Sequence, residues 1–404
     1  MDKKNKNPNV PNLRFSNPYK LRKVRLGDIC TITGGYAFDS HKMKQQGEYQ
    51  IIKMGNLYNG IFDLSRNQSF INVPTKKELE YLIQKNDILI TLTGTTNKKD
   101  YGYTVQIEKP KKLLLNQRCA LIRASKVNEK YLFYLLNSND FLKQFYASST
   151  GGTGNQTNVS INDMLDFKVY ISNENDQLKI SNILNALDKK ISTQIKIISD
   201  YTFLLNLLRD KLLYDKNHKK IKLSTLISIY NGYAFKSNNY KANAKYKIIT
   251  IGNVTGDRYI NLDSINTIDK LPSDIQQHQI INKGSILVSL TGNVGRTSIC
   301  NEDDCLLNQR VALVKSKNIN EKFIYHILSS SRFLNKMISS SQGAAQKNIS
   351  TKDILNYEIT LLSKERMEYV TLLLEKIENK INYEKNILEH LYTQKQYFLK
   401  NMFI

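Results

Sequence analysis

The chain has 404 residues, too many for one ordinary hydrophobic core, so its length predicts two or three domains. Hydrophobic residues make up 41% of the sequence and charged residues 24%, which excludes a fully disordered chain. Fifty-nine Lys and Arg against 36 Asp and Glu give a net charge of +23, typical of proteins that bind a polyanion or an acidic membrane surface.

Residues 1–20 are predicted to be a basic N-terminal tail. They are rich in Asn, Lys and Pro and lack the apolar core of a signal peptide. The whole sequence has no run of about 18 apolar residues, so we do not expect a membrane-spanning helix. We therefore expect a cytoplasmic protein with no membrane partner.

Residues 21–172 are predicted to form a mixed α/β lobe. Strand-like runs such as "DILITLTG" (87–94) accompany a helix-like run over 129–146. Near its start lies "GGYAF" (34–38), in which the glycines suit a tight turn and the aromatic residues suit core packing. Tyr36 is also a candidate for contact with a phosphate.

Residues 173–213 predict a long central helix. Apolar residues recur at spacings of three and four over several heptads, and the polar Gln194 interrupts them near the middle. Such a helix is about 60 Å long, more than one lobe requires. The pattern favours packing against another helix, and an amphipathic helix packed on its own lobe is the alternative.

Residues 214–362 repeat the first lobe. The offset between matching segments changes from 197 and 198 to 192 and 190, which places insertions and deletions in surface loops. The chain is therefore a tandem duplication. The matching pairs are "GGYAF" with "NGYAF" (231–235), "DILITLTG" with "SILVSLTG" (285–292), "LLNQRCAL" (114–121) with "LLNQRVAL" (306–313), and "QTNVSINDML" (156–165) with "QKNISTKDIL" (346–355).

Residues 363–404 predict a second long helix with the same spacing, interrupted at Glu384. If the two helices pair antiparallel, Gln194 and Glu384 meet in one central layer, where a buried hydrogen bond between them would fix the register. A parallel pairing would also bring them level, so the antiparallel direction is a hypothesis. The expected fold class is α+β, with two tandem mixed α/β domains separated by two long helices that form an antiparallel coiled coil.

Most of the positive charge lies outside the helices. Residues 173–213 carry six Lys and Arg against five acids, and residues 363–404 carry seven against six, so +21 of the +23 belongs to the lobes and the tail. Basic lobes rich in Tyr, Asn, Gln and Thr are typical of nucleic-acid contact. The alternative is that the Lys and Asn content reflects coding bias and ordinary solvated faces.

The sequence contains no constellation that indicates catalysis. No GxxxxGK[ST] loop is present, and "STGGTG" (149–154) is best interpreted as a flexible loop. The five histidines have neither metal-ligand spacing nor the arrangement of a triad. Cys300 and Cys305 are close, but no second pair of Cys or His accompanies them at zinc-site spacing.

The duplicated order of "GGYAF", "GN", "LTG" and "NQR", with a long helix after each lobe, resembles the specificity subunit of type I restriction-modification enzymes. The resemblance covers about residues 20–404. It implies two target recognition domains, at 21–172 and 214–362, which a coiled coil relates by a pseudo-two-fold axis and holds at the spacing of two DNA half-sites.

The resemblance also implies the partners. This family binds double-stranded DNA together with two methyltransferase subunits, which dock on the helices and use S-adenosylmethionine, and with translocase-nuclease subunits, which use ATP and Mg²⁺. No cofactor is then expected on this chain, and the chain itself is not an enzyme.

We expect DNA contacts from the loop after each "LTG" and from each "NQR". The first loop differs between the copies, "TNKKDYG" against "NVGRT", so the lobes should read different sequences. In "NQR" an amide suits adenine and a guanidinium suits guanine or phosphate, although a hydrogen-bond network at a strand end is the alternative. The candidate DNA-binding residues are Tyr36, Thr93, Thr95, Asn97, Lys98, Lys99, Tyr101, Gln117, Arg118, Tyr233, Thr291, Asn293, Arg296, Thr297, Gln309 and Arg310.

Two other functions fit the same features. One alternative is the recognition half of a system with one combined nuclease-methyltransferase partner that cuts both sides of its site. A non-catalytic protein with two lobes on a coiled-coil spacer and only salt-sensitive, non-specific nucleic-acid binding is the other alternative.

Overall fold

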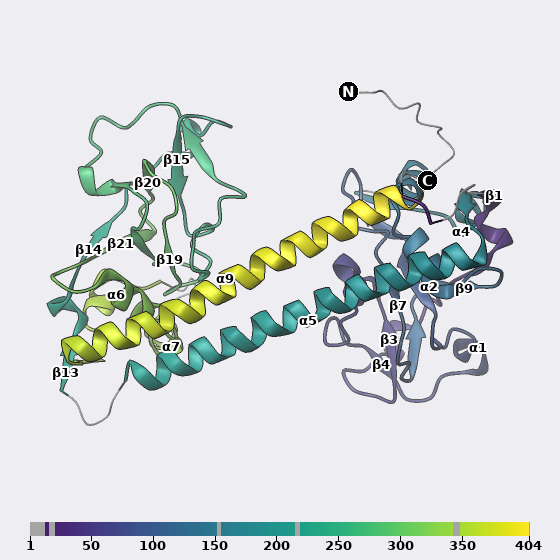
Figure 1. The fold of residues 1–404 in the computed structure, drawn as a ribbon, viewed down its shortest axis with the longest axis horizontal. Helices are drawn as coiled ribbons and strands as arrows, with labels where there is room; N and C mark the ends of the chain where they lie inside the picture. The colour runs from purple at the N-terminus through teal and green to yellow at the C-terminus, as the bar shows by residue number, and fades with distance from the viewer. Residues whose placement is uncertain (1–12, 16–20, 152–154, 215–218, 342–347, 404) are drawn as a thin grey trace. The chain divides into compact units, whose positions relative to one another are not determined.

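Each copy of the repeat folds around the same antiparallel sheet. The computed structural model describes residues 13–15, 21–151, 155–214, 219–341 and 348–403 (Figure 1). Within those residues the first sheet has the order β2-β9-β5-β7 and the second β14-β21-β18-β19. The bounds are β2 (Cys30–Gly34), β9 (Cys119–Ala124), β5 (Ile88–Thr91), β7 (Thr104–Gln106), β14 (Ile227–Asn231), β21 (Val311–Ser316), β18 (Ile286–Ser289) and β19 (Thr297–Ile299).

The interior strands explain the apolar runs in the sequence. In β5 and β18 all four residues are buried, because neighbouring strands and packed layers cover both faces. The run "DILITLTG" does not form one strand. It breaks after Thr91, and β6 (Thr93–Thr95) pairs with a different segment.

A smaller sheet extends each lobe. In the first copy the order is β4-β3-β8, and in the second β16-β15-β20-β17, with β3 parallel to β8 and β15 parallel to β20. A second apolar cluster lies against each of these sheets. The bounds are β3 (Tyr49–Ile52), β4 (Phe70–Ile71), β8 (Leu113–Leu115), β15 (Tyr246–Ile249), β16 (Asn266–Ile268), β17 (Ile280–Ile281) and β20 (Cys305–Leu307).

The helix expected over 129–146 is two helices. α2 (Glu129–Leu135) ends before Ser138, whose Oγ accepts a hydrogen bond from Phe141 N at 3.3 Å and starts α3 (Asn139–Ala147). Ser330 does the same between α6 (Glu321–Leu328) and α7 (Ser331–Ser340). Apart from short 3-10 helices, the remaining elements are α1 (Lys76–Leu79), α4 (Ile161–Asp166), α8 (Thr351–Leu355), β10 (Thr150–Gly151) and β11 (Gln156–Asn158). Two strand pairs close the lobes: β1 (Arg22–Arg25) with β12 (Lys168–Ile171), and β13 (Lys220–Lys222) with β22 (Glu358–Thr360).

The long helices α5 (Glu174–Leu212) and α9 (Lys364–Asn401) are each shared by two compact units. Unit 1 contains Met1–Thr193 and Ile387–Ile404, and unit 2 contains Gln194–Asn386. The predicted segments treated each helix as separate from the lobes, whereas each compact unit combines one lobe with a part of each helix. Of the expected tail, residues 1–12 and 16–20 lie outside the described part of the chain.

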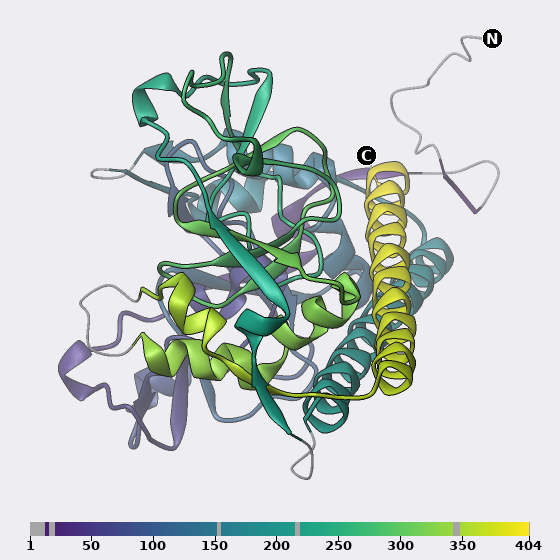
Figure 2. The ribbon, with the colours of Figure 1, turned by 90° about the vertical axis from the view of Figure 1, so that its left-hand side faces the viewer.

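Within each unit, the parts of α5 and α9 lie side by side and run antiparallel (Figures 1 and 2). In unit 2, Gln194 near the start of its α5 half contacts Glu384, and Arg209 near the end contacts Glu378, so position rises along one helix as it falls along the other. The apolar seam joins the lobe core, because Leu205, Val370 and Leu374 belong to the same buried cluster as the sheet. In unit 1, Leu184 and Leu399 join the first lobe core in the same way.

Gln194 and Glu384 meet as the heptad interruption predicts. Gln194 is 8% exposed, and its Nε2 donates to the Glu384 backbone oxygen at 3.0 Å and also to the Glu384 carboxylate. The Lys380 ammonium and the Gln194 amide lower the pKa of Glu384. The buried amide therefore has a charged partner within the seam between α5 and α9.

Candidate nucleic-acid interface

The second glycine of "GGYAF" contacts the asparagine of "NQR", and the same contact occurs in the second copy. A Cβ on Gly35 would lie 2.1 Å from the Asn116 carbonyl oxygen, and one on Gly232 would lie 2.2 Å from that of Asn308. Because no side chain fits in that space, glycine is required at both positions. The turn is then held by Gln117 N, which donates to Tyr36 O at 3.0 Å.

The "LTG" segment lies beside the "NQR" turn and is hydrogen-bonded to it. Leu92 N donates to Arg118 O at 3.0 Å, and Val159 N donates to Leu92 O at 3.1 Å. In unit 2 the same bonds run from Leu290 N to Arg310 O at 2.9 Å and from Ile349 N to Leu290 O at 2.9 Å. Three segments far apart in sequence therefore form one edge in each lobe. We call it the polar edge, comprising residues 116–118, 92–93 and 158–159 in unit 1 and residues 308–310, 290–291 and 348–349 in unit 2.

One side-chain bond is also repeated on the polar edge. Thr93 Oγ1 donates to Asn158 Oδ1 at 3.2 Å, and Thr291 Oγ1 donates to Asn348 Oδ1 at 3.0 Å. Because each asparagine oxygen is engaged, its amide N–H groups are the part left to face a ligand. Both asparagines are exposed.

The two interpretations of "NQR" apply to different residues of the motif. Asn116 is buried beneath the turn, and Asn308 Oδ1 accepts from Arg310 N at 3.2 Å, so the asparagine belongs to the strand-end network. The other two residues of each motif bond the neighbouring segments through their backbone groups, and their side chains are exposed. These residues are Gln117, Arg118, Gln309 and Arg310. The predicted amide and guanidinium are therefore available on both polar edges.

In the loop after the first "LTG", Asn97 and Lys98 are exposed and Thr95 is half-buried. Lys99 is exposed and lies over the ring of Tyr146, 5.3 Å from its centroid. Tyr101 is only 3% exposed, and its ring packs against Phe145. We therefore remove Tyr101 from the predicted interface, because its side chain is part of the core.

In the second loop, Asn293 is exposed and Arg296 is half-buried. Thr291 is committed to its bond with Asn348. Thr297 is 2% exposed, and its hydroxyl donates to Leu328 O at 2.9 Å. Thr297 is removed from the predicted interface for the same reason as Tyr101, since it points into the lobe.

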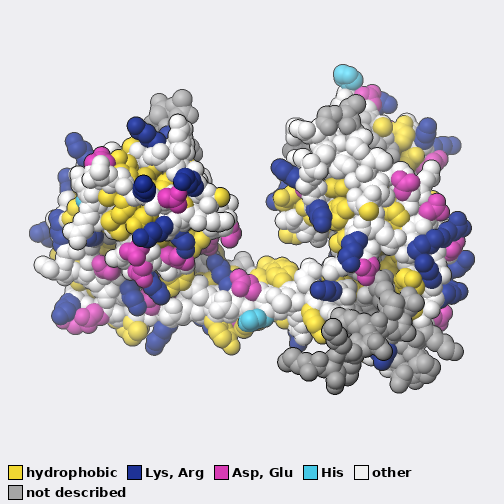
Figure 3. Space-filling model, turned by 90° about the horizontal axis from the view of Figure 1, so that it is seen from above, with side chains coloured by type: hydrophobic (Ala, Val, Ile, Leu, Met, Phe, Trp, Pro, Cys, Tyr) yellow, Lys and Arg dark blue, Asp and Glu magenta, His cyan; other side chains and the backbone are white. Residues whose placement is uncertain are grey.

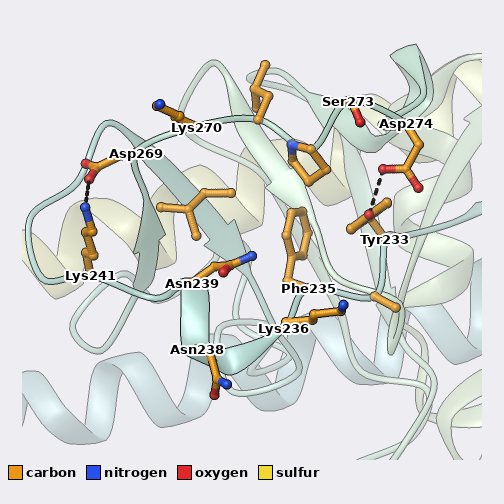
Figure 4. A pocket seen from close by; sticks show the side chains of 14 residues that line it. Tyr233, Phe235, Lys236, Asn238, Asn239, Lys241, Asp269, Lys270, Ser273 and Asp274 are labelled. Atoms are coloured by element: carbon orange, nitrogen blue, oxygen red, sulfur yellow. Dashed lines mark hydrogen bonds and ion pairs between the residues drawn. The ribbon is translucent and has the colours of Figure 1, made fainter.

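The second polar edge borders a hollow of about 820 Å³. Figure 4 shows a separate pocket, which contains Tyr233. The Tyr233 hydroxyl donates to Asp274 at 2.7 Å, and this bond raises the pKa of Tyr233. Tyr233 packs against Phe235 as Tyr36 packs against Phe38 in unit 1, and Tyr36 also contacts Tyr81. The hollow is lined by Asn231, Gly232, Leu290, Thr291, Gln309, Arg310, Asn348, Ile349, Ser350 and Thr351.

Sequence reasoning missed Asn158 and Asn348. Both lie in the repeated segments "QTNVS" and "QKNIS", and a polar residue kept at the same place in two diverged copies was the signal. The repeat shows the match, but only the fold brings these residues to "LTG" and "NQR".

Basic side chains are spread over the lobes. On the face shown in Figure 3, Lys and Arg are scattered among neutral side chains with fewer acids between them. Dispersed cations of this kind suit contact with successive phosphates of a duplex. Among the described residues, no helix is long and apolar enough to cross a membrane.

A group with metal-ligand chemistry occurs in unit 2, but arginines occupy it. Ligand atoms of His326, Glu375 and Glu378 lie within 4.8 Å of one another. The Arg258 and Arg209 guanidiniums bind the two carboxylates, so the charge that a cation would neutralise is already paired. We interpret the group as a structural ion network that joins α9 to the lobe.

The fold and the polar edges define a class of protein: a tandem repeat in which two lobes, each with an exposed amide-guanidinium edge, share two long helices. The sequence profile of the type I restriction modification DNA specificity domain matches residues 18–198 and 215–392. The chain therefore belongs to this family of DNA specificity subunits, which are the non-catalytic recognition components of their complexes.

Individual relatives agree over nearly the whole chain. The chain is 24% identical over 403 residues to the type I restriction enzyme MjaVIII specificity subunit of Methanocaldococcus jannaschii, covering 93% of this chain and 90% of the relative. The S subunit of the type I system from M. genitalium has a TM-score of 0.57 at 16% identity and covers 98% of this chain and 99% of its own.

A third similarity is to a chain from a structure on complex assembly and conformational transition of a type I system. It has a TM-score of 0.55 at 16% identity, with 94% of this chain and 96% of the other covered. The two structural similarities establish the fold, and the family match establishes DNA recognition within a restriction-modification complex.

Proposed function

We propose that each unit reads one half of a bipartite DNA sequence through its polar edge. The observation that carries the proposal is the duplicated edge itself, with the same backbone bonds and the same Thr–Asn bond in both lobes. Exposed Gln and Arg side chains can make two-point contacts with adenine and guanine in the major groove. The loops that differ beside each edge would let the half-sites differ.

The α5 and α9 pair is proposed to set the gap between the half-sites. Its seam is apolar except for defined polar contacts such as Gln194 with Glu384, which favour one register over a shifted one. A fixed register gives a fixed spacing, as in other readers whose half-site separation follows from protein geometry.

The outward faces of α5 and α9 are proposed to dock two methyltransferase subunits. Large apolar side chains outside the seam are exposed on both helices, such as Phe203 at 70% on α5 and Tyr383 at 60% on α9. S-adenosylmethionine, ATP and Mg²⁺ would then act on partner subunits, including the translocase-nuclease subunits.

Mapping methylated adenines in cells that express this chain with its methyltransferase tests the proposal. We expect one bipartite motif with a constant gap. Methylation without a fixed gap would contradict the spacing role, and methylation of every duplex alike would contradict sequence reading. Recovery of a single partner that carries both nuclease and methyltransferase domains would favour the combined system.

A further inference from the structure

Unit 1 extends its polar edge into a small three-stranded ribbon. β11 pairs antiparallel with β6 in the register Gln156 to Thr95, Thr157 to Gly94 and Asn158 to Thr93, and β10 pairs with the other side of β11. In the described part of unit 2 the corresponding segments pair only at Thr291 and Asn348. The ribbon is therefore an addition to the element that both lobes share.

The two faces of the ribbon differ. Directly paired residues point to the same face, so Thr93, Thr95, Gln156 and Asn158 form a two-by-two array of hydroxyl and amide groups. Both amide residues of this array are exposed. The other face packs on the lobe: Thr157 is buried, and a Cβ on Gly94 would lie 2.3 Å from the Tyr101 ring. Tyr101 thus supports the ribbon from below.

The turn beside the array is held in place. The two Asp100 carboxylate oxygens accept from Thr95 N and from Thr95 Oγ1, each at 2.7 Å. Asn97 has a φ of 63°, in the left-handed region that asparagine tolerates in tight turns. These bonds fix Thr95 opposite Gln156. They also occupy the Asp100 carboxylate, while the neighbouring Lys98 and Lys99 remain exposed.

We propose that Gln156 reads an adenine in the half-site bound by unit 1, with Asn158 beside it. The exposed Gln156 amide can contact N6 and N7 of adenine at once from the major groove. Lys98 and Lys99 would neutralise phosphates at the groove wall. The inference rests on the proposed function and adds the residue and the base.

Two substitutions test the proposal in the full complex by methylation mapping. Gln156→Ala should relax one position of one half-site by about tenfold or more, and Gln156→Glu should shift that position toward cytosine, whose N4 donates to a carboxylate. The other half-site and the gap should not change. Gln84→Ala, at another exposed glutamine of unit 1, is the matched control and should leave the motif intact.

A purified complex gives a second readout. A duplex with 7-deazaadenine at the relaxed position lacks the N7 acceptor. The unaltered complex should bind this duplex less tightly than the duplex with adenine, and the Gln156→Ala complex should bind the two duplexes equally. An unchanged motif in both Gln156 variants, while the unaltered complex still methylates one bipartite motif, would overturn this inference alone. Loss of any motif in the unaltered complex would overturn the proposed function instead.

Discussion

Arg258 and Glu375 form a buried two-point ion pair in unit 2, with Nη1 to Oε1 and Nη2 to Oε2 distances of 2.9 Å each. Arg258 lies in the lobe, where its carbonyl accepts from Ile299 N, and Glu375 lies on α9. Glu378 bonds Arg258 as well, and it also accepts from Arg209 and from the Tyr325 hydroxyl. The network therefore fastens the recognition lobe to the long helix.

Removing one member of this network should be costly. Arg258→Ala leaves two buried carboxylates with fewer partners, so we expect a loss of about 3 kcal/mol in the free energy of unfolding. Chemical denaturation of the full chain measures it. Lys385→Ala, which breaks an exposed pair with Asp257, is the control and should cost less than about 1 kcal/mol. Equal effects of the two substitutions would show that the network adds no special stability.

Stability should fall as pH drops below about 6.5. Burial and the nearby Arg209 charge hold the pKa of His326 below its ordinary value, so the unfolded chain takes up a proton that the folded chain refuses. The slope is at most about 1.4 kcal/mol per pH unit for one proton. Denaturation curves at pH 7.5, 6.5 and 5.5 test this, and His326→Gln should flatten the slope in that range.

A second loss should begin near pH 4.5 and continue below it. Burial raises the pKa of Glu375, but hydrogen bonds from His326 and Arg258 and the Arg258 charge outweigh it, so the net pKa lies well below the ordinary value. Protonation then removes stability as pH falls toward the folded pKa. Glu375→Gln should lower stability at neutral pH and reduce the dependence in this acidic range.

Gln194→Leu should keep or raise the melting temperature while loosening the register of α5 and α9. The substitution replaces the polar Gln194 side chain in the apolar seam, and Glu384 keeps its bond with Lys380. Calorimetry gives the melting temperature, and the gap lengths in the methylation motif report the register. A large drop in melting temperature with an unchanged gap would contradict a role in register.

Gly35→Ala should distort the first polar edge. The added Cβ would meet the Asn116 carbonyl at 2.1 Å, where backbone and not a flexible side chain must move. We expect a cost of about 2 kcal/mol or more and relaxed reading of one half-site. Gly151→Ala is the matched control, because a Cβ there meets nothing within 4 Å and should change stability by less than about 0.5 kcal/mol.

Arg118 and Lys98 should fail in different ways when each is replaced by Ala. If Arg118 reads a base, Arg118→Ala should weaken the binding free energy for the specific duplex by about 1–3 kcal/mol and relax one position of the motif. If Lys98 binds a phosphate, Lys98→Ala should weaken binding to all duplex sequences alike and reduce the slope of log affinity against log salt by about 1. Titrations of specific and random duplexes at several salt concentrations separate these outcomes. If Arg118→Ala changed neither affinity nor motif, the "NQR" turn would not lie at the interface.

The sequence by itself determined the duplication, the long helices with their polar interruptions, and the repeat of "NQR" with its candidate amide and guanidinium. These features depend on periodicity and on identity between copies, which are properties of the chain order alone. The glycine in each "GYAF" could be assigned to a tight turn for the same reason, but not to its contact with Asn116.

Only the tertiary structure decided which polar residues share an edge. Asn158 lies 65 residues from Thr93, and no local pattern reports a hydrogen bond across that separation. Tyr101 lies in a polar-looking loop and Thr297 follows one at the start of β19, yet both side chains point into the lobe. Side-chain direction in a loop follows from which surfaces pack on it, and packing is a property of the assembled lobe.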